Sequence, residues 1–290
     1  MANIKELKKR IKSTKSTLKI TSAMKLVSAA KLAKAQARIQ GFKPYSNELD
    51  KTVRTASALA KDYSHEFLKE SDSKNAAILI VSSEKGLCGG YNSQLFKQVK
   101  NFISENKDMN FKFYFIGRKV KELLSREGVS EEKSFSFAKA EPEFEEVKKV
   151  SKELANLFVS GQVGNLFIAY NSFLSAIEFE SRVSQVLPMT VSDEEKEKLA
   201  EEFPVDFKYE PSAEVILDNL VPEVFNTTVF TSILDAVAAE HGSRMTAMDN
   251  ATTNSKDMIR NLTLTANKLR QAAITTELTE IVSGAESLNS

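Results

Sequence analysis

The stretch from residue 241 to residue 276 reads HGSRMTAMDNATTNSKDMIRNLTLTANKLRQAAITT. Along it, a stripe of eleven positions alternates between steps of four and three residues: His241, Met245, Met248, Thr252, Ser255, Ile259, Leu262, Ala266, Leu269, Ala273 and Thr276. This spacing puts all of them on one face of an α-helix. No glycine or proline occurs from residue 243 to residue 283. We therefore expect one helix there, on the order of 60 Å long at about 1.5 Å per residue.

The start of the chain carries a matching stripe. Residues 1–40 also lack glycine and proline, and their seam positions are Ile4, Leu7, Ile11, Thr14, Leu18 and Thr21. We expect this register to slip next, to Ile20, Met24, Val27 and Lys31. Alanines dominate residues 23–37 and leave room for a close partner. Two antiparallel helices from the chain's ends, sharing one seam, satisfy both stripes.

Composition and charge narrow the protein class. One cysteine in 290 residues, Cys88, excludes an internal disulfide and a cysteine-based metal cluster. No run approaches the roughly 18 to 20 apolar residues of a membrane helix. Residues 1–43 hold 12 basic residues against Glu6 alone, a net +11, so the rest of the chain carries −10. Such a basic end suits nucleic acid, an anionic membrane surface, an acidic protein partner or a transit peptide. The transit peptide is disfavoured among these, because such a peptide needs no helical seam that continues into a folded chain.

Between the two helical ends the pattern is that of strands and helices in alternation. Predicted strands cover residues 76–82, 112–117, 166–170 and 177–183, and predicted helices start near Ser93, Val120 and Pro142. This alternation predicts a Rossmann-like sheet flanked by helices. The fold class is thus α/β plus a long antiparallel coiled coil. Its parts are an N-terminal coiled-coil helix at 1–60, a central α/β domain at 75–207 and a C-terminal coiled-coil helix at 210–290. Residues 193–206, with seven acids and two lysines, read as a solvated linker; upstream of residue 241, Pro222 is expected to kink or restart the final helix.

Catalytic constellations are scarce in this sequence. The two histidines, His65 and His241, are far apart, so a triad or a histidine metal site has little support. The turn GLCGG at residues 86–90 follows a predicted strand, but its glycines fit neither common phosphate-loop pattern. A tight structural turn is the better interpretation. We expect no catalytic residue, no cofactor and no metal.

Four segments resemble the gamma subunit of F-type (F1Fo) ATP synthases of bacteria. They are KITSAMKLVSAAK at 19–31, KGLCGG at 85–90, RMTAMDNAT at 244–252 and ITTELTEIVSGA at 274–285. Their order and spacing match over essentially the whole chain. One departure is Gly242-Ser243, where the family commonly carries two alanines. A helical glycine costs about 1 kcal/mol relative to alanine, which loosens that turn.

The resemblance implies a non-catalytic rotor shaft. The paired helices would stand inside a hexamer of three alpha and three beta subunits, with the α/β domain on the ring of c subunits beside epsilon. Ion flow would turn ring and shaft, coupling rotation to ATP synthesis or hydrolysis at the beta-subunit sites. The implied location is peripheral, on the cytoplasmic face of the bacterial plasma (inner) membrane, touching the membrane only through the Fo sector. A bacterial source is favoured because the chain starts directly with the shaft helix.

The resemblance also implies contacts at specific residues. Alpha and beta contacts are expected at Arg244, Arg270, Gln271, Thr275 and Glu277, and at Met24 and Lys25 near the beta lever. Foot contacts to the c ring are expected at Phe207 and Tyr209. For each of these residues a solvated helix face or ordinary packing is the alternative.

The resemblance further suggests that Met24 pairs with Met245, which puts Ile4 opposite about Thr265 and leaves residues beyond about Gln271 as a single helix. Two rival functions remain open. One is a coiled-coil nucleic-acid binder that uses the lysine face. The other is a small nucleotide-using enzyme built on the middle domain.

Overall fold

The structure is a computed structural model that describes the chain except residues 1–3, 61–62, 139–141, 191–208 and 290, and except the side chains of residues 286–289. Residue contacts divide it into two compact units. One joins residues 1–28 with 245–290, and the other is residues 29–244. Two long helices, α1 and α6, contribute to both units. The linker predicted at residues 193–206 lies outside the described residues, as does Phe207.

Both terminal helices are longer than their glycine-free runs. Helix α1 spans Ile4–Leu59 and continues through Gly41 and Pro44. Helix α6 spans Ala213–Asn289 and continues through Pro222. The expectation that Pro222 restarts the helix is therefore wrong. Val221, Val224 and Phe225 beside it are buried, and this packing holds the turn helical although proline removes one backbone hydrogen bond.

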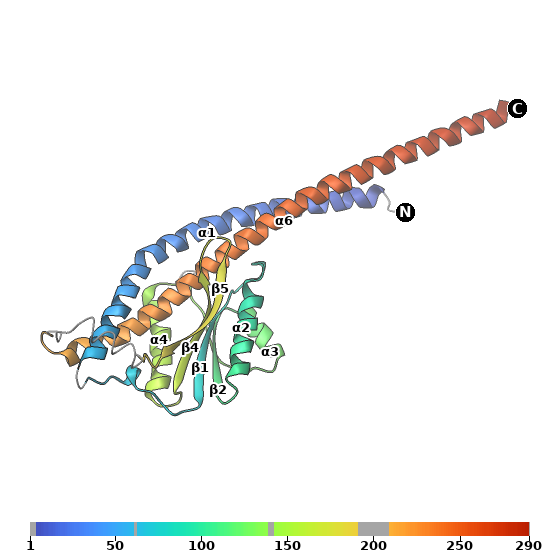
Figure 1. Cartoon of the computed structure of the whole chain (residues 1–290). Coiled ribbons are helices and arrows are strands. Elements are labelled where there is room, and N and C mark those ends of the chain that lie inside the picture. Colours follow the sequence, from blue (N-terminus) through green and yellow to red (C-terminus); the bar gives the residue numbers. More distant parts are fainter. Residues whose placement is uncertain (1–3, 61–62, 139–141, 191–208, 290) are drawn as a thin grey trace. The chain divides into compact units, whose positions relative to one another are not determined.

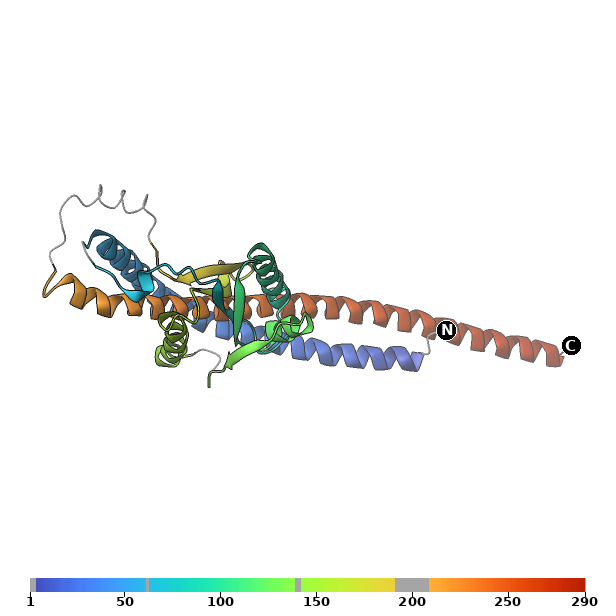
Figure 2. The same ribbon diagram turned by 90° about the horizontal axis from the view of Figure 1, so that it is seen from below.

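In the first unit α1 and α6 run antiparallel, side by side in both views (Figure 1 and Figure 2). The Thr252 hydroxyl donates to the Thr21 hydroxyl at 2.9 Å, and Lys25 Nζ lies 2.6 Å from Asp249 Oδ1. Because the helices are antiparallel, the threonine pair puts Met24 opposite about residue 249. The expected pairing with Met245 is thus displaced by about one helical turn.

The seam of α1 does not slip. Ile20 and Val27 are 57% and 56% exposed, whereas Ser28 is buried. The seam thus continues from Thr21 in the same alternating steps, through the buried Leu32, Ala35 and Ile39. The predicted slip is wrong because it follows the largest apolar side chains. The seam here is instead lined partly by small hydroxyl residues.

The second unit contains a five-stranded sheet in the order β3-β2-β1-β4-β5. Its strands are β1 (Asn75–Val81), β2 (Asn110–Ile116), β3 (Glu131–Phe135), β4 (Asn165–Phe173) and β5 (Phe179–Leu187). The first four strands are parallel, and β5 is antiparallel to β4. The chain winds outward from β1 to β3 and then returns to the other side of β1, so the strand order switches between β1 and β4.

Helices cover both faces of this sheet (Figure 1). Helices α2 (Tyr91–Glu105) and α3 (Lys119–Arg126) lie on one face, and α4 (Phe144–Val159) lies on the other. Strand β1 is buried on both faces, which explains its uninterrupted apolar run. Its side chains at Ile78 and Ile80 pack with the α2 and α3 residues Leu95, Val99, Val120 and Leu124.

Elements of the second unit also fasten α6 beside the sheet. Lys43 Nζ of α1 lies 3.3 Å from the buried carboxylate of Asp235 on α6, which also accepts a hydrogen bond from Ser172 of β4. The Tyr91 hydroxyl at the start of α2 donates to the carbonyl of Ala236 at 3.0 Å. Between Pro222 and His241, α6 is therefore held by the domain that it crosses.

Candidate functional site

The seam of the paired helices is built from small and hydroxyl-bearing side chains. Thr21, Ser28, Thr252 and Ser255 are buried there, together with Ala266. Several hydroxyls also donate to carbonyls of their own helix, such as Ser255 to Ala251 at 2.7 Å. These bonds satisfy buried polar groups and let the two backbones approach closely. The seam stripe of α6 is confirmed as far as Leu269.

Beyond Leu269 the C-terminal helix has no covering partner within the described residues. Every residue from 270 to 285 is exposed, and α6 runs past the N-terminal end of α1 in both views (Figure 1 and Figure 2). Four large apolar side chains share one face of it, Ile274, Leu278, Ile281 and Val282, at 48% to 63% exposure. This C-terminal apolar stripe is a surface that water covers poorly.

Four predicted contact residues lie in that exposed segment. Arg270, Gln271, Thr275 and Glu277 are all exposed, and the Thr275 hydroxyl donates to the Gln271 carbonyl at 3.0 Å. The apolar stripe beside them was missed as a site by sequence reasoning. Its signal was present, since positions 274, 278, 281 and 282 follow helical spacing after the seam has ended.

The outer face of α1 in the first unit is strongly basic. Exposed lysines line it at positions 5, 8, 9, 12, 15 and 19, against the single acid Glu6, which pairs with Arg10. Ile20, Leu26 and Val27 are exposed at the end of this face, with Leu26 at 68%. Met24 is half-buried, and Lys25 is held by Asp249. Cations followed by exposed apolar residues form a surface suited to an acidic partner.

Arg244 is engaged within the second unit. Its guanidinium donates to the carbonyls of Lys85 and Gly86 at 2.9 and 3.3 Å and to the Glu240 carboxylate at 2.6 Å. The two side chains are only 11% and 19% exposed. Burial raises the pKa of Glu240, and the neighbouring Arg244 opposes that rise. Next to this pair, the Ser243 hydroxyl donates to the Cys88 carbonyl at 2.6 Å.

The Gly86–Gly90 turn is accordingly bound to α6 rather than open to a ligand. Within it, Leu87 has a φ of 63°, and on either side of it Asn92 donates to the Ser83 hydroxyl at 2.8 Å. Cys88 is buried, and burial raises the pKa of its thiol, so the thiolate form is disfavoured. This geometry is that of a structural turn, which agrees with the sequence prediction.

The structure gives a steric reason for a glycine at position 242. An added Cβ there would lie 2.9 Å from the carbonyl oxygen of Ala176, in the turn between β4 and β5. Both His241 and Gly242 are buried. Position 242 is therefore a close approach between the β4–β5 turn and α6.

The remaining predicted residues are placed as follows. Tyr209 is half-buried, and its hydroxyl donates to the carbonyl of Ala56 at 3.0 Å, near the end of α1. His65 accepts a hydrogen bond from the Phe67 amide at 3.0 Å, and burial lowers its pKa. Within the described part of the chain, no group of three or more His, Cys, Asp or Glu side chains could hold a metal ion. Nor does any described helix combine the length and apolarity that crossing a membrane requires.

Comparison with known proteins identifies the family. A family model described as ATP synthase matches residues 3–288. The ATP synthase gamma chain of Lachnoclostridium phytofermentans is 36% identical over 294 residues, covering 100% of both chains. That of Bdellovibrio bacteriovorus is 39% identical over 295 residues, covering 99% of both. A chain in the cryo-EM structure of the Euglena gracilis mitochondrial ATP synthase (OSCP, F1 and c-ring) has a TM-score of 0.70 at 17% identity, covering 98% of this chain and 94% of that one, which supports the fold. The chain belongs to the ATP synthase gamma-chain family.

Proposed function

We propose that this chain is the central rotor shaft of a bacterial F-type ATP synthase. It performs no chemistry itself. It couples rotation of the c-ring, driven by ions, to ATP synthesis or hydrolysis at the beta-subunit sites of the alpha3-beta3 hexamer. The alpha, beta, epsilon and c subunits are its partners. It meets the cytoplasmic face of the plasma membrane only through them.

The observation that carries this proposal is the C-terminal apolar stripe. A single helix whose described residues are exposed all round from Arg270 to Ala285, with four large apolar side chains on one face, calls for an enclosing partner. A hexamer with a central channel encloses such a helix on every side. One asymmetric helix inside a three-fold sleeve contacts the three beta subunits unequally. Rotation therefore imposes different conformations on three identical sites in turn.

The basic face of α1 suits the second contact, with acidic lever segments of the beta subunits. Many screened charge pairs can form and break one after another as the shaft turns. Met24 and Lys25 lie at the end of this face, beside Leu26 and Val27. In this proposal Arg270, Gln271, Thr275 and Glu277 meet alpha and beta loops.

Arg244 has a further role in the proposal. Its bonds to Glu240 and to the carbonyls of Lys85 and Gly86 hold the Gly86–Gly90 turn against α6, and through that turn it contributes to the beta contact. Phe207 and Tyr209 are proposed at the foot, on the side of the c ring. The Tyr209 hydroxyl donates to the carbonyl of Ala56 on α1.

Reconstitution with alpha and beta subunits of the same organism tests the function. Lys107, which is exposed on the sheet domain, is replaced by cysteine to carry a bead, while the native Cys88 is buried. We expect ATP-dependent rotation of the bead in one direction with three pauses per turn. Failure to co-assemble with alpha and beta would overturn the proposal. Tight, steeply salt-dependent binding of duplex DNA instead would identify a nucleic-acid binder.

A further inference from the structure

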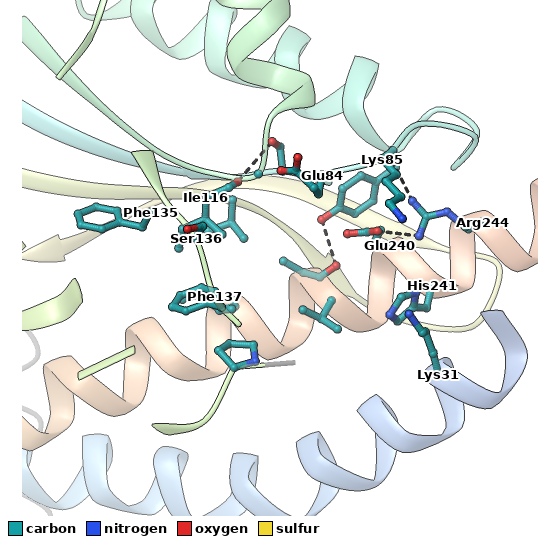
Figure 3. A pocket seen from close by; sticks show the side chains of 18 of the residues that line it. Lys31, Glu84, Lys85, Ile116, Phe135, Ser136, Phe137, Glu240, His241 and Arg244 are labelled. Atoms are coloured by element: carbon teal, nitrogen blue, oxygen red, sulfur yellow. Dashed lines mark hydrogen bonds and ion pairs between the residues drawn. The ribbon is translucent and has the colours of Figure 1, made fainter. Parts of the chain in front are cut away.

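A cavity of about 350 Å³ lies in the second unit, between the carboxyl ends of β1, β2 and β3 and the side of α6. Figure 3 shows its residues at close range. In open parallel sheets, ligands bind in the crevice beyond the carboxyl ends of the strands, next to the point where the strand order switches. The volume falls at the lower end of the range for small-molecule sites, about 300 to 1,000 Å³.

One end of the cavity is aromatic. Phe135, at the end of β3, and Phe137 line it, with Ile116 of β2 beside them (Figure 3). Tyr114 stacks on Phe135 with ring centroids 6.3 Å apart and 18° between the ring planes, which fixes the ring that the cavity presents. On the opposite wall, Ile233 of α6 completes an apolar slot. A flat ring system fits between such walls.

The other end of the cavity is charged. Lys31, Lys85, Glu84, Glu240 and Arg244 all line it (Figure 3). The two carboxylates already have cationic partners, because Glu240 pairs with Arg244 and Glu84 lies 3.6 Å from Arg118.

The two lysines differ from the other charged groups of the cavity. Among the described residues, no ion pair joins a carboxylate to Lys31 or Lys85, and both lysines are exposed. Lys31 still lies near enough to Glu240 to act against the rise in the pKa of that carboxyl group. With three cationic and two anionic side chains in the lining, this end of the slot carries one cation in excess, which favours an anionic group there.

The walls of the cavity are held in place before any ligand arrives. The Tyr91 hydroxyl is bonded to the Ala236 carbonyl, and Arg244 is bonded to the carbonyls of Lys85 and Gly86. These bonds join the strand ends to α6 on one side of the cavity. A preformed site costs little ordering on binding.

We propose that this cavity is a binding site for a small aromatic anion, a flat one- or two-ring molecule that carries a carboxylate or phosphate group. Its ring lies between Phe137 and the apolar wall of α6, and its anionic group lies between Lys31 and Lys85. A bound molecule touches both the strand ends and α6, so binding stabilises the attachment of α6 to the sheet.

The Gly86–Gly90 turn takes no part in this site. Its backbone faces α6 through the bonds to Arg244 and Ser243, and its glycines are absent from the cavity lining. The proposed anion is therefore bound by side-chain ammonium groups and not by a loop of backbone amides. The site is distinct in this respect from a phosphate-binding loop.

A tryptophan reporter tests the proposal in the full-length chain, which contains no tryptophan of its own. Phe137→Trp puts the only indole in the cavity, and Phe96→Trp puts it on α2, outside the cavity lining. The probes are 2-naphthoate and the uncharged 2-naphthalenemethanol. We expect 2-naphthoate to change the fluorescence of the Phe137→Trp variant saturably, with the alcohol binding about tenfold more weakly. The Phe96→Trp variant should show no saturable change.

Two double lysine variants measure how much the charges of Lys31 and Lys85 contribute to binding. In the Phe137→Trp background, Lys31→Gln with Lys85→Gln should raise the Kd for 2-naphthoate about tenfold, because two charge-assisted contacts are lost. Lys107→Gln with Lys149→Gln removes the same charge from exposed positions elsewhere and should leave the Kd unchanged. Equal changes in both tryptophan variants, no saturable signal, or an unchanged Kd in the Lys31/Lys85 variant would overturn the proposal.

A second measurement needs no tryptophan. In the unaltered chain, 2-naphthoate should raise the midpoint of thermal unfolding more than the same concentration of 2-naphthalenemethanol. This difference should vanish in the Lys31/Lys85 variant and persist in the Lys107/Lys149 variant. Equal shifts by acid and alcohol in the unaltered chain would count against the site even if the Phe137→Trp variant did not fold.

Discussion

At the scale of single residues, Gly242 illustrates how a local cost is offset by a tertiary contact. A glycine inside a helix is about 1 kcal/mol less favourable than alanine. Here the missing methyl group makes room for the Ala176 carbonyl, which an added Cβ would approach to 2.9 Å. The β4–β5 turn can therefore lie directly on α6. Sequence alone indicated a loosened turn at this position, because the contact joins residues 66 positions apart.

Replacing Gly242 with alanine should destabilise the protein. The steric cost of about 1 to 3 kcal/mol exceeds the gain of about 1 kcal/mol in helix propensity. We expect the free energy of unfolding in urea to fall by about 1 kcal/mol. Gly41→Ala is the matched control, because Gly41 lies inside α1 with nothing within 4 Å of an added Cβ. The control should gain stability, and equal gains in both variants would refute the steric argument.

The Arg244–Glu240 pair predicts a pH dependence. Removing the guanidinium by Arg244→Gln leaves the mostly buried Glu240 carboxylate without the cation that counters burial, so the pKa of Glu240 rises further. When the pKa of a carboxyl group is higher in the folded protein than in the unfolded one, the group favours folding at a pH below its unfolded pKa. This contribution to the free energy of unfolding is lost as the pH rises through the folded pKa.

Arg244→Gln should therefore lower the free energy of unfolding more at pH 8 than at pH 5. At pH 8 the loss should be about 3 kcal/mol. Urea unfolding across this range measures it. In the double variant Arg244→Gln with Glu240→Gln, the extra pH dependence should disappear. If it remains, another group is responsible.

At the scale of elements, residue spacing predicted the seam positions of the paired helices but not their register. Alternating steps of three and four identified both seams, because every buried position of a two-helix interface must obey that spacing. The register was wrong by about one turn, since small seam residues such as Thr21, Ser28, Thr252 and Ser255 leave several alignments similar in energy. Strand β3 was missed for a related reason. Its sequence EEKSF is exposed and charged, and only its pairing with β2 makes it a strand.

Disulfide formation checks the observed register. The Thr21 and Thr252 hydroxyls are 2.9 Å apart, so Thr21→Cys with Thr252→Cys should cross-link readily under mild oxidation. Met24→Cys with Met245→Cys, which is one turn out of register, should cross-link much more slowly. Gel mobility with and without reductant reports both. Faster cross-linking of the Met24/Met245 variant would restore the register suggested by the family resemblance.

The C-terminal apolar stripe predicts a change in assembly without a change in folding. Ile274→Ser, Leu278→Ser and Ile281→Ser together should leave the unfolding of the isolated chain unchanged, because these side chains are already exposed. Affinity for alpha and beta subunits should fall at least about tenfold, because each substitution removes apolar area that is buried in the complex. Thr276→Ser with Thr279→Ser is the control on the same segment. An unchanged affinity in the triple variant would contradict the proposal that the hexamer encloses this helix.

At the scale of the whole molecule, charge is distributed very unevenly. Residues 1–43 carry a net +11 within a chain whose total is +1. Such a separation was fully readable from the sequence, because it depends on composition and not on packing. What the sequence left open was which of the basic residues stay exposed. The structure settles that for α1, where nearly every lysine of the first unit faces solvent and Lys25 is held by Asp249.

Neutralising part of this charge should weaken coupling in a salt-dependent way. Lys8→Gln, Lys12→Gln, Lys15→Gln and Lys19→Gln together remove four exposed charges, each worth about 0.2 to 1 kcal/mol in a screened pair. We expect rotation-coupled ATPase activity to fall about tenfold at low salt. The difference from the unaltered chain should shrink toward about 1 M salt, where the Debye length is about 3 Å. An effect independent of salt would point to packing instead of charge.

The hydroxyl-rich seam has a mechanical consequence for the first unit. Interlocking leucines would resist sliding of α1 along α6, because each knob must leave its hole before the helices can shift. Thr21, Ser28, Thr252 and Ser255 are shallow, and their hydroxyls can exchange one nearby acceptor for another. Small axial displacements therefore meet low barriers, while each helix stays continuous and keeps its bending stiffness. The pair should therefore yield along its axis before it bends, which a leucine-lined seam of the same length would resist.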